Sequence, residues 1–228
     1  MKPFRDRTEA GRRLAGALAH LKDRRPVVLA LPRGGVPVAA EIAAALSASL
    51  DLVLVRKIGL PGQPELAMGA VVDGAEPITV RNEDVIRLAG IDDTLFARVR
   101  DRELAEIERR REVYLGDRRR VDPKGRVVIV VDDGIATGAT VKAALRAIRK
   151  RGPERLVLAV PVAPPETIAE LRREVDEIVC PETPSPFGAI GFFYIDFTQV
   201  DDAAVADALA RFPVAEADTA ARGPDTQV

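Results

Sequence analysis

Two adjacent carboxylates, Asp132 and Asp133, are the side chains of this sequence whose type and position best suit chemistry. They follow residues 127–131, a run of β-branched apolar residues typical of a strand buried on both faces. Residues 134–140, with the sequence GIATGAT, come next and open a helix. A strand, acidic side chains and then a loop of small residues at a helix N-terminus is an order in which α/β proteins present a phosphate site.

The carboxylates and the loop predict two kinds of contact. Small residues around Gly138 let backbone N–H groups converge on an anion, and the helix dipole favours negative charge there. The hydroxyls of Thr137 and Thr140 can add donors. The carboxylates would repel a phosphate, but they can accept hydrogen bonds from sugar hydroxyls or face a cationic centre. The stretch therefore predicts a site for a ribose together with its phosphate.

Other phosphate motifs do not fit. A P-loop needs a lysine after its second glycine, and none follows Gly138. The dinucleotide fingerprint needs G-x-G-x-x-G, whereas the glycines here are spaced G-x-x-x-G. An Asp-x-Asp phosphatase would need carboxylates two positions apart. The simpler interpretation of the Asp-Gly pair alone is a capped turn between a strand and a helix.

A second tight turn follows residues 26–31, which are predicted to form a buried strand, and precedes a helix over residues 36–48. Arg33 can present its planar guanidinium to phosphate oxygens. Gly34 and Gly35 allow the backbone to approach a ligand closely.

A third strand, predicted over residues 51–55, is followed by Arg56 and Lys57. If this strand belongs to the same parallel sheet, both cations face the same crevice, and we expect Lys57 to contact a phosphate. The alternative is a solvated basic turn.

The remaining pattern predicts an α/β fold, a mainly parallel twisted sheet with helices on both faces, in one domain over residues 1–214. Residues 60–69, rich in proline and glycine, are predicted to be a loop that acts as a lid. The pattern also predicts the following segments: a hairpin of residues 70–72 with 78–80, a helical insertion over residues 82–120, a hood over residues 181–200, a helix over residues 201–212 and a disordered tail over residues 215–228. The arginines at 109–111 and 118–120 are interleaved with acidic residues, which predicts a solvated helix face rather than a nucleic-acid patch.

Composition limits the protein class. The chain has 228 residues with 47% hydrophobic residues and a formal net charge of −1, so no global field favours nucleic acid or a membrane. The single cysteine permits no internal disulfide and suits a reducing cytoplasm. No apolar stretch approaches the ~20 residues that span a bilayer. We therefore expect a cytoplasmic protein with neither nucleic acid nor membrane as a partner.

The central stretch VVIVVDDGIATGAT resembles the phosphoribosyl diphosphate-binding motif of the type I phosphoribosyltransferases. The resemblance implies that Asp132 and Asp133 are the catalytic-site residues that hold the ribose hydroxyls. It also implies further substrate-binding residues: Ala136, Thr137, Gly138, Ala139 and Thr140 around the 5-phosphate, and Arg33, Gly34, Gly35 and Lys57 around the diphosphate. In the family the turn at Arg33 contains an unusual peptide conformation. One departure is Gly134, where many members carry an aliphatic residue or Ser, and we expect it to loosen the turn.

The implied activity is transfer of a ribose 5-phosphate unit from phosphoribosyl diphosphate to a nitrogen acceptor, a glycosyltransferase reaction, with Mg²⁺ held mainly by substrate oxygens and water. No residue is predicted as a metal ligand, and no general base is identified. Five aromatic residues between 187 and 197 either stack on a nucleobase-like acceptor or fill the space beside the core. The long helix of the insertion either packs on the sheet or makes a contact in a homo-oligomer. The alternative function is a regulator or sensor that binds phosphoribosyl diphosphate without catalysis.

Overall fold

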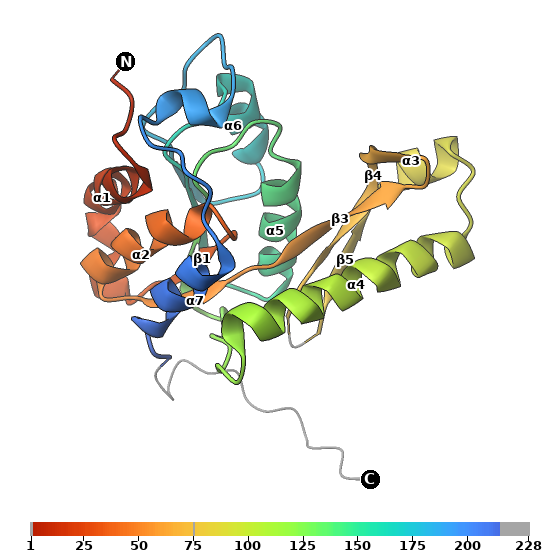
Figure 1. Cartoon of the computed structure of the whole chain (residues 1–228), viewed down its shortest axis with the longest axis horizontal. Coiled ribbons are helices and arrows are strands. Elements are labelled where there is room, and N and C mark those ends of the chain that lie inside the picture. The colour runs from red at the N-terminus through yellow and green to blue at the C-terminus, as the bar shows by residue number, and fades with distance from the viewer. Residues whose placement is uncertain (1, 75, 215–228) are drawn as a thin grey trace.

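A five-stranded parallel sheet forms the centre of the protein, as the computed structural model shows for residues 2–74 and 76–214 (Figure 1). The strand order is β2 (Ser49–Leu52), β1 (Val27–Ala30), β6 (Val127–Val131), β7 (Arg155–Ala159) and β8 (Glu177–Val179). Every neighbouring pair is parallel. The predicted α/β class is therefore confirmed, while the tail predicted over residues 215–228 lies outside the described residues.

Helices cover both faces of this sheet. On one face α2 (Gly35–Leu46) packs on β1 and β6, with α1 (Arg7–Ala17) and α7 (Asp202–Ala210) against it. The other face is covered by α5 (Ala139–Lys150) and α6 (Pro165–Leu171).

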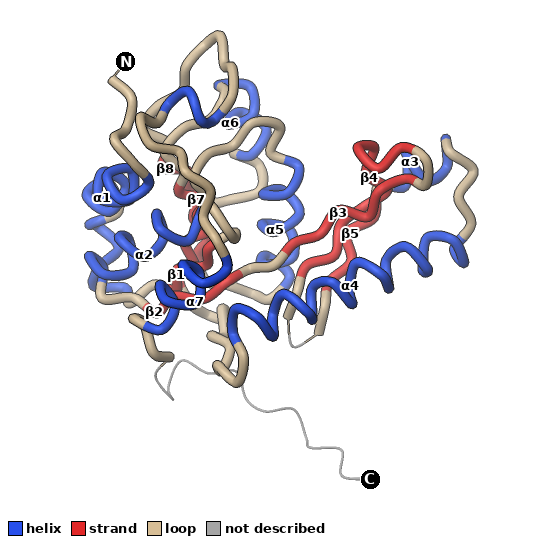
Figure 2. The backbone as a smooth tube through the Cα atoms, viewed as in Figure 1, coloured by secondary structure: helices blue, strands red, loops and turns tan. Residues whose placement is uncertain are grey.

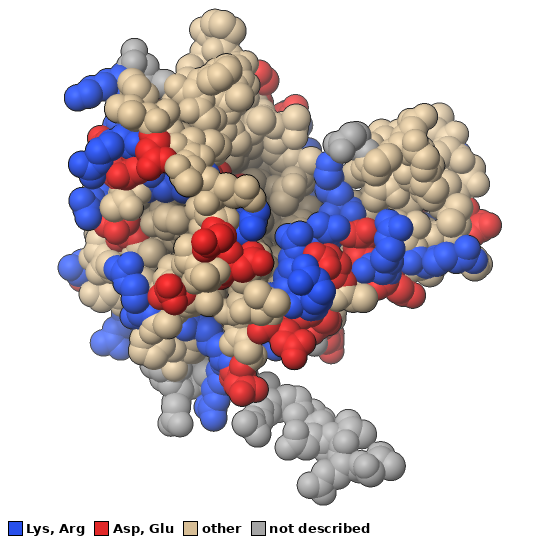
Figure 3. All heavy atoms as spheres, viewed as in Figure 1, with Lys and Arg blue, Asp and Glu red and all other residues tan. Residues whose placement is uncertain are grey.

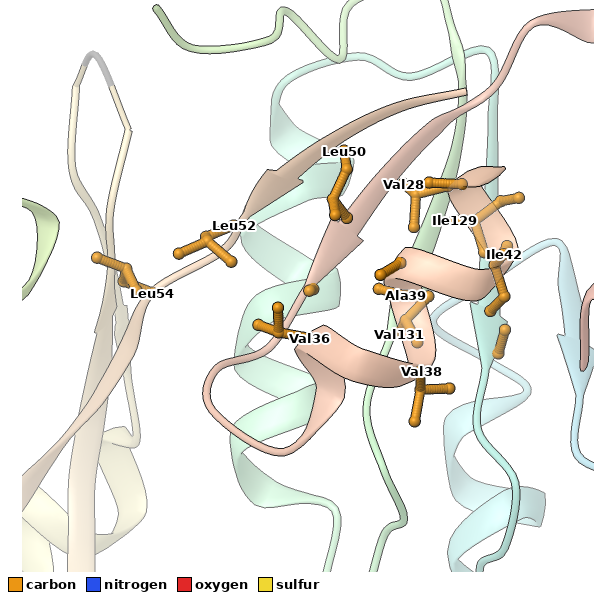
Figure 4. Packing of buried hydrophobic residues seen from close by; sticks show 14 of the residues in the cluster. Val28, Val36, Val38, Ala39, Ile42, Leu50, Leu52, Leu54, Ile129 and Val131 are labelled. Atoms are coloured by element: carbon orange, nitrogen blue, oxygen red, sulfur yellow. The ribbon is translucent and has the colours of Figure 1, made fainter. Parts of the chain in front are cut away.

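The strand residues alternate between these two layers. Val28, Ile129 and Val131 belong to the cluster under α2, where their side chains meet those of Val38 and Ile42 (Figure 4). The intervening residues of the same strands belong to the cluster under α5. All five residues of β6 are buried, which explains why its sequence is an unbroken apolar run.

The segment after β2 differs from the prediction. Residues 55–72 form β3 (Val55–Leu60) and β4 (Gln63–Val72), which pair with β5 (Ile78–Arg81) in a separate antiparallel sheet. The predicted hairpin of residues 70–72 with 78–80 is confirmed. The predicted strand over residues 51–55 is confirmed only in part, because β2 covers residues 51–52 and ends at Leu52, and residue 55 already belongs to β3. The predicted loop over residues 60–69 is wrong, because residues 63–69 belong to β4.

Two features of β4 explain why proline did not prevent a strand. The pairing of β3 with β4 is irregular between Ile58 and Leu60, and Pro64 lies opposite this irregularity. Pairing of β4 with β5 begins only at Gly69, so Pro64 has no neighbour on that side. Proline is tolerated at such bulged and unpaired positions because its missing N–H breaks no ladder hydrogen bond.

The antiparallel sheet, α3 (Glu83–Leu88) and α4 (Asp93–Leu115) form an arm, defined here as residues 55–115, that projects from the central sheet (Figure 2). The side chains of Asn82 and Asp92 cap the N-termini of α3 and α4. Only one stripe of α4 is buried, including Phe96 and Ile107. Its outer face carries basic and acidic side chains side by side (Figure 3). None of the helices in the described part of the chain is long and apolar enough to cross a membrane.

The arginines after α4 correct the prediction of a solvated helix face. The helix ends at Leu115, before Arg118 and Arg120. Arg120 pairs with the buried carboxylate of Asp73 at 3.0 Å. Arg118 donates from Nη1 to the Leu209 carbonyl at 2.7 Å and from Nη2 to the Leu50 carbonyl at 2.7 Å and the Phe212 carbonyl. These arginines are structural, because they satisfy carbonyl and carboxylate groups that the fold buries.

Arg118 is expected to hold α7 against β2. Arg118→Met should lower the free energy of unfolding by about 1–3 kcal/mol, because it leaves carbonyl groups without their donor. Arg119→Met is the matched control, since the neighbouring Arg119 is exposed. Urea denaturation of both variants measures the difference, and an equal effect of the two substitutions would contradict the role of Arg118.

Candidate functional site

The site lies where the strand order changes direction. From β1 the sheet grows to one side through β2 and to the other through β6, so the turns that follow β1 and β6 diverge from a common crevice at the carboxyl ends of these strands. In open α/β sheets such a switch point is where ligands bind. The predicted residues Arg33, Gly34 and Gly35 lie on the first turn, and Asp132 and Asp133 on the second.

These two turns touch. A Cβ atom added at Gly34 would lie 2.0 Å from Oδ2 of Asp133, and one added at Gly35 would lie 2.7 Å from the carbonyl oxygen of Val131. Neither position can hold a side chain, so the glycines are required by the approach of the backbone to the carboxylates. The peptide bond between Pro32 and Arg33 is cis, which is the unusual peptide conformation expected at this turn.

The two carboxylates differ in their surroundings. Burial, and then the negative charge of Asp133, raise the pKa of Asp132 well above its ordinary value. Asp133 is buried, and its Oδ2 accepts a hydrogen bond from Nε of Arg7 at 2.7 Å. The Tyr194 hydroxyl donates to the Asp133 carbonyl oxygen at 2.6 Å. Both carboxylates are thus set at the crevice, with Asp133 held by side chains from the two ends of the chain.

The loop after the carboxylates is open to solvent on the side away from the sheet. Ala136, Thr137, Ala139 and Thr140 are exposed, while Gly138 is buried and caps α5 with φ of +74°. No side chain caps this helix N-terminus, which leaves its donors available to an anion.

Helix α6 supports this loop from beneath. Oγ1 of Thr167 donates to the Ala136 carbonyl at 2.8 Å. A Cβ atom at Gly138 would lie 2.9 Å from Cγ2 of Thr167, so the glycine allows both the positive φ and the close packing.

Arg33 and Lys57 reach the site region from different directions. Nη1 of Arg33 lies 3.5 Å from Oδ1 of Asp202 at the start of α7. Both side chains are well exposed, so this pair contributes little stability. Arg33 is therefore not committed to a strong structural contact there.

Lys57 is exposed on β3 of the arm rather than at the end of a strand of the parallel sheet. It lines a cleft of about 600 Å³ together with Thr140 of the phosphate loop and Arg102 of α4. Figure 3 shows a hollow between the arm and the rest of the molecule. Arg56, its neighbour, pairs with Glu103 of α4 at 2.8 Å and so anchors β3 to α4.

The hood, residues 181–200, uses its aromatic side chains mainly for packing. Tyr194 is buried against Phe4, with ring centroids 5.5 Å apart, and Phe187 packs on Phe193 at 5.1 Å. Phe192 is 76% exposed. Packing contacts thus account for Tyr194, Phe187 and Phe193, whereas Phe192 and, at 37%, Phe197 are exposed, so stacking on an acceptor stays a prediction for these two.

A match to a family model decides the family. Residues 6–196 match the phosphoribosyl transferase domain. The chain belongs to this family. The match begins at Asp6, the N-cap of α1, and ends within the hood. It therefore includes both turns of the site and the loop over residues 136–140.

The chain is also similar to two individual proteins, and the name of the first agrees with this family. A protein of Mycobacterium tuberculosis strain CDC 1551 named "Putative phosphoribosyl transferase MT0597" is 48% identical over 202 residues, which are 89% of this chain and 45% of that protein. The chain thus spans about half the length of this relative. The crystal structure of TT1426 from Thermus thermophilus is 44% identical with a TM-score of 0.83, over 94% of this chain and 100% of that one.

The departure from the family motif at Gly134 has a packing reason. A Cβ atom there would lie 2.5 Å from Cγ2 of Ile190 and 3.2 Å from Cγ1 of Val162. Ile190 belongs to the short 3-10 helix of the hood, Ile190–Phe193. The glycine therefore gives the hood room to pack on the turn, and the expected loosening of the turn stays a prediction.

The sequence did not reveal Arg7, Thr167 and Tyr194. Arg7 lies in a strongly charged segment, Thr167 in a segment without a recognisable motif, and Tyr194 among the aromatic residues for which two roles were open. Cys180 is not a candidate nucleophile, because burial raises the pKa of its thiol to about 11.

Gly34→Ala tests the contact between the turns. The added methyl group would overlap the Asp133 carboxylate, and we expect a loss of about 1–3 kcal/mol in the free energy of unfolding. The control is Gly16→Ala in α1, where an added Cβ has no heavy atom within 4 Å and the change should be neutral or stabilising. Chemical denaturation is the measurement, and equal stability of Gly34→Ala and wild type would show that the turns are not in contact.

Asp132→Asn tests the buried charge. The pKa of Asp132 is raised in the folded state, so the folded protein binds the carboxyl proton more tightly than the unfolded chain does. The contribution of Asp132 to the free energy of unfolding therefore falls as the pH rises above the pKa of about 4 that an aspartate has in the unfolded chain. The variant should therefore be more stable than wild type at pH 7.5, with a gap that narrows toward pH 4. Urea denaturation at several pH values measures this gap. A variant less stable than wild type at neutral pH would contradict the buried charge.

Proposed function

We propose that the protein transfers a ribose 5-phosphate unit from phosphoribosyl diphosphate to a nitrogen atom of a small, nucleobase-like acceptor, with release of diphosphate. The observation that carries this proposal is the contact between the Asp132–Asp133 pair and the glycine turn after β1, beside the uncapped N-terminus of α5. The two carboxylates, the helix N-terminus and the close-approach turn follow neighbouring strands at one edge of the sheet, which supports a common site for the ribose and the phosphates of the donor.

Each part of the donor has a matching part of the crevice. The carboxylates of Asp132 and Asp133 would accept hydrogen bonds from the 2- and 3-hydroxyls of the ribose. Backbone N–H groups over residues 136–140 and the exposed hydroxyls of Thr137 and Thr140 would surround the 5-phosphate. The turn at Arg33, Gly34 and Gly35 would hold the diphosphate.

Lys57 would approach the donor from the arm, across the cleft that it shares with Thr140. Lys57 belongs to the arm and Thr140 to the phosphate loop, so they line the cleft from two parts of the fold. A movement that narrows the cleft would bring both residues to the same ligand.

The reaction needs positioning and charge stabilisation more than covalent chemistry. The bond between C1 of the ribose and the diphosphate oxygen breaks, and its electron pair leaves with the diphosphate. The lone pair of the acceptor nitrogen forms the new bond to C1, and a proton carried by that nitrogen passes to the released diphosphate. Positive charge develops on the ring as the leaving group departs, and the neighbouring carboxylates stabilise it. Holding donor and acceptor in line would supply much of the remaining acceleration.

A divalent ion fits this scheme as part of the substrate. The described residues contain no group of three or more His, Cys, Asp or Glu side chains that could hold a metal ion. Mg²⁺ commonly keeps several waters and binds substrate phosphates with few protein ligands. In this proposal it comes with the donor and neutralises charge on the diphosphate.

Binding of the donor tests the proposal directly. Asp132→Asn and Asp133→Asn should each weaken binding of phosphoribosyl diphosphate with Mg²⁺ about tenfold to a hundredfold, because a hydrogen bond to a charged group contributes about 1.5–3 kcal/mol. Isothermal titration calorimetry measures the affinity. Asp117→Asn is the control, since Asp117 is exposed and belongs to neither of the two turns of the site. Unchanged affinity in both site variants would rule out the ribose role.

Catalysis is tested by diphosphate release. Incubation with phosphoribosyl diphosphate, Mg²⁺ and a panel of nucleobases should release diphosphate only with a productive acceptor. Tight donor binding without release for any acceptor would favour the sensor over the transferase.

A further inference from the structure

Arg7, at the start of α1, reaches the candidate ribose site from the opposite end of the chain. Its Nε donates to Oδ2 of Asp133 at 2.7 Å, across 126 positions of sequence. Each of the two side chains is only 11% exposed. The Arg5–Asp6 pair nearby is 64% and 34% exposed, a surface contact of the kind that contributes little. The Arg7–Asp133 pair is different because it is sheltered from water and involves a residue of the site.

The same guanidinium is fixed to the hood. Its Nη1 donates to the Thr198 carbonyl at 2.8 Å, and its central carbon lies 4.0 Å from the centre of the Phe197 ring. A guanidinium above an aromatic face is attracted by the ring's negative π cloud. One side chain therefore touches Asp133 and the hood at once.

Backbone contacts join the N-terminal segment to the hood beside Arg7. Phe4 N–H donates to the Phe193 carbonyl at 2.8 Å, and Ile195 N–H donates to the Phe4 carbonyl at 2.8 Å. The Tyr194 hydroxyl, from the same part of the hood, donates to the Asp133 carbonyl. Movement of the hood would thus be transmitted to Asp133 through both its side chain and its backbone.

Asp133 is contacted by Arg7 from α1 at its carboxylate and by the Tyr194 hydroxyl from the hood at its carbonyl oxygen. Asp196 of the hood interacts electrostatically with Arg7. The turn after β1 brings Gly34 against Asp133, while the charged side chain of this turn, Arg33, lies 3.5 Å from Asp202. Arg7 is the cation that offsets the negative charge of the pair and acts to lower the pKa of Asp132 against the larger effect of burial.

We propose that Arg7 is a positioning residue that holds the Asp133 carboxylate for the ribose and makes donor binding and the order of the hood depend on each other. The part of this inference that concerns the donor rests on the proposed function. The link between Arg7, Asp133 and the hood does not, because it is argued only from contacts between residues of the chain.

The experiment compares three variants. Arg7→Met removes the charge and the donors, and Arg7→Lys keeps the charge but loses the planar fork. Arg13→Met is the matched control, because Arg13 lies in the same helix, stacks on Phe4 at 4.6 Å and pairs with Glu182 at 2.8 Å. It thus touches the same N-terminal segment and, through Glu182, also the hood, but these contacts do not involve Asp132 or Asp133. Circular dichroism confirms that each variant is folded.

Calorimetric titration with phosphoribosyl diphosphate and Mg²⁺ between pH 5 and 8 gives the first readout. Arg7→Met should weaken binding about tenfold or more at neutral pH, in line with the loss of a hydrogen bond to a charged group. Without the cation the pKa of Asp132 rises further, so the loss of affinity on acidification should begin at a higher pH than in wild type. Arg7→Lys should keep the pH dependence close to wild type while binding remains weaker, and Arg13→Met should change neither.

Hydrogen exchange of the hood gives the second readout, and it is measured first on the proteins alone and then with added donor. Amides of residues 192–198 should exchange faster in Arg7→Met than in Arg13→Met, and added donor should slow them in wild type but not in Arg7→Met. Equal effects of Arg7→Met and Arg13→Met on affinity and exchange would reduce Arg7 to general packing and overturn the proposal. A shift in affinity without any shift of the pH dependence would also overturn it.

A wild-type protein that does not bind phosphoribosyl diphosphate would refute the proposed function. Hydrogen exchange in the proteins without donor then tests the link between Arg7, Asp133 and the hood independently of the proposed function. Faster exchange in Arg7→Met than in Arg13→Met would support the coupling of Asp133 to the hood, and equal exchange would overturn it.

Discussion

The close approach of the glycine turn after β1 to the carboxylates after β6 is the constraint on which the site depends. It exists because β1 and β6 are parallel neighbours and their carboxyl ends lie at the same edge of the sheet. The fully buried strand β6 fixes the position of Asp132 and Asp133, which follow it directly. The absence of side chains at Gly34 and Gly35 allows the turn after β1 to contact them. Both turns then lead directly into helices, α2 and α5, so the crevice is lined by helix N-termini on either side.

The arm and the hood each contribute residues to the surroundings of the two turns. The arm contributes Lys57 to the cleft beside the phosphate loop, and its strand β3 is anchored to α4 by the pair of Arg56 and Glu103. The hood packs on the motif through Ile190 at Gly134 and through the Tyr194 hydroxyl. The outer parts of the fold therefore meet the central motif at defined contacts, while the motif itself belongs to the buried sheet.

The central sheet and the two turns could be predicted because buried parallel strands have unbroken apolar sequences and because Asp132, Asp133 and Gly138 follow such a strand at fixed spacing. The strands β3 and β4 could not, because Pro64 and the neighbouring glycines indicate a loop unless a bulge is known. The local sequence predicts Arg120 on a solvated helix face, because nothing close to it in the sequence indicates that the buried Asp73 is its partner. Arg7 gave no signal because its partner is 126 positions away. Contacts of this range depend on the tertiary fold rather than on local pattern.

The distance in sequence between Arg7 and Thr198 has a consequence for how the protein is made. During synthesis the carboxylate pair leaves the ribosome well before the hood does, and the N-terminal segment leaves before either. Contacts between such remote segments carry a large loop-closure cost and form late. A nascent chain can therefore complete its parallel sheet while Asp133 still lacks its contacts with the hood, and the candidate site reaches its final form only when the two ends of the fold meet.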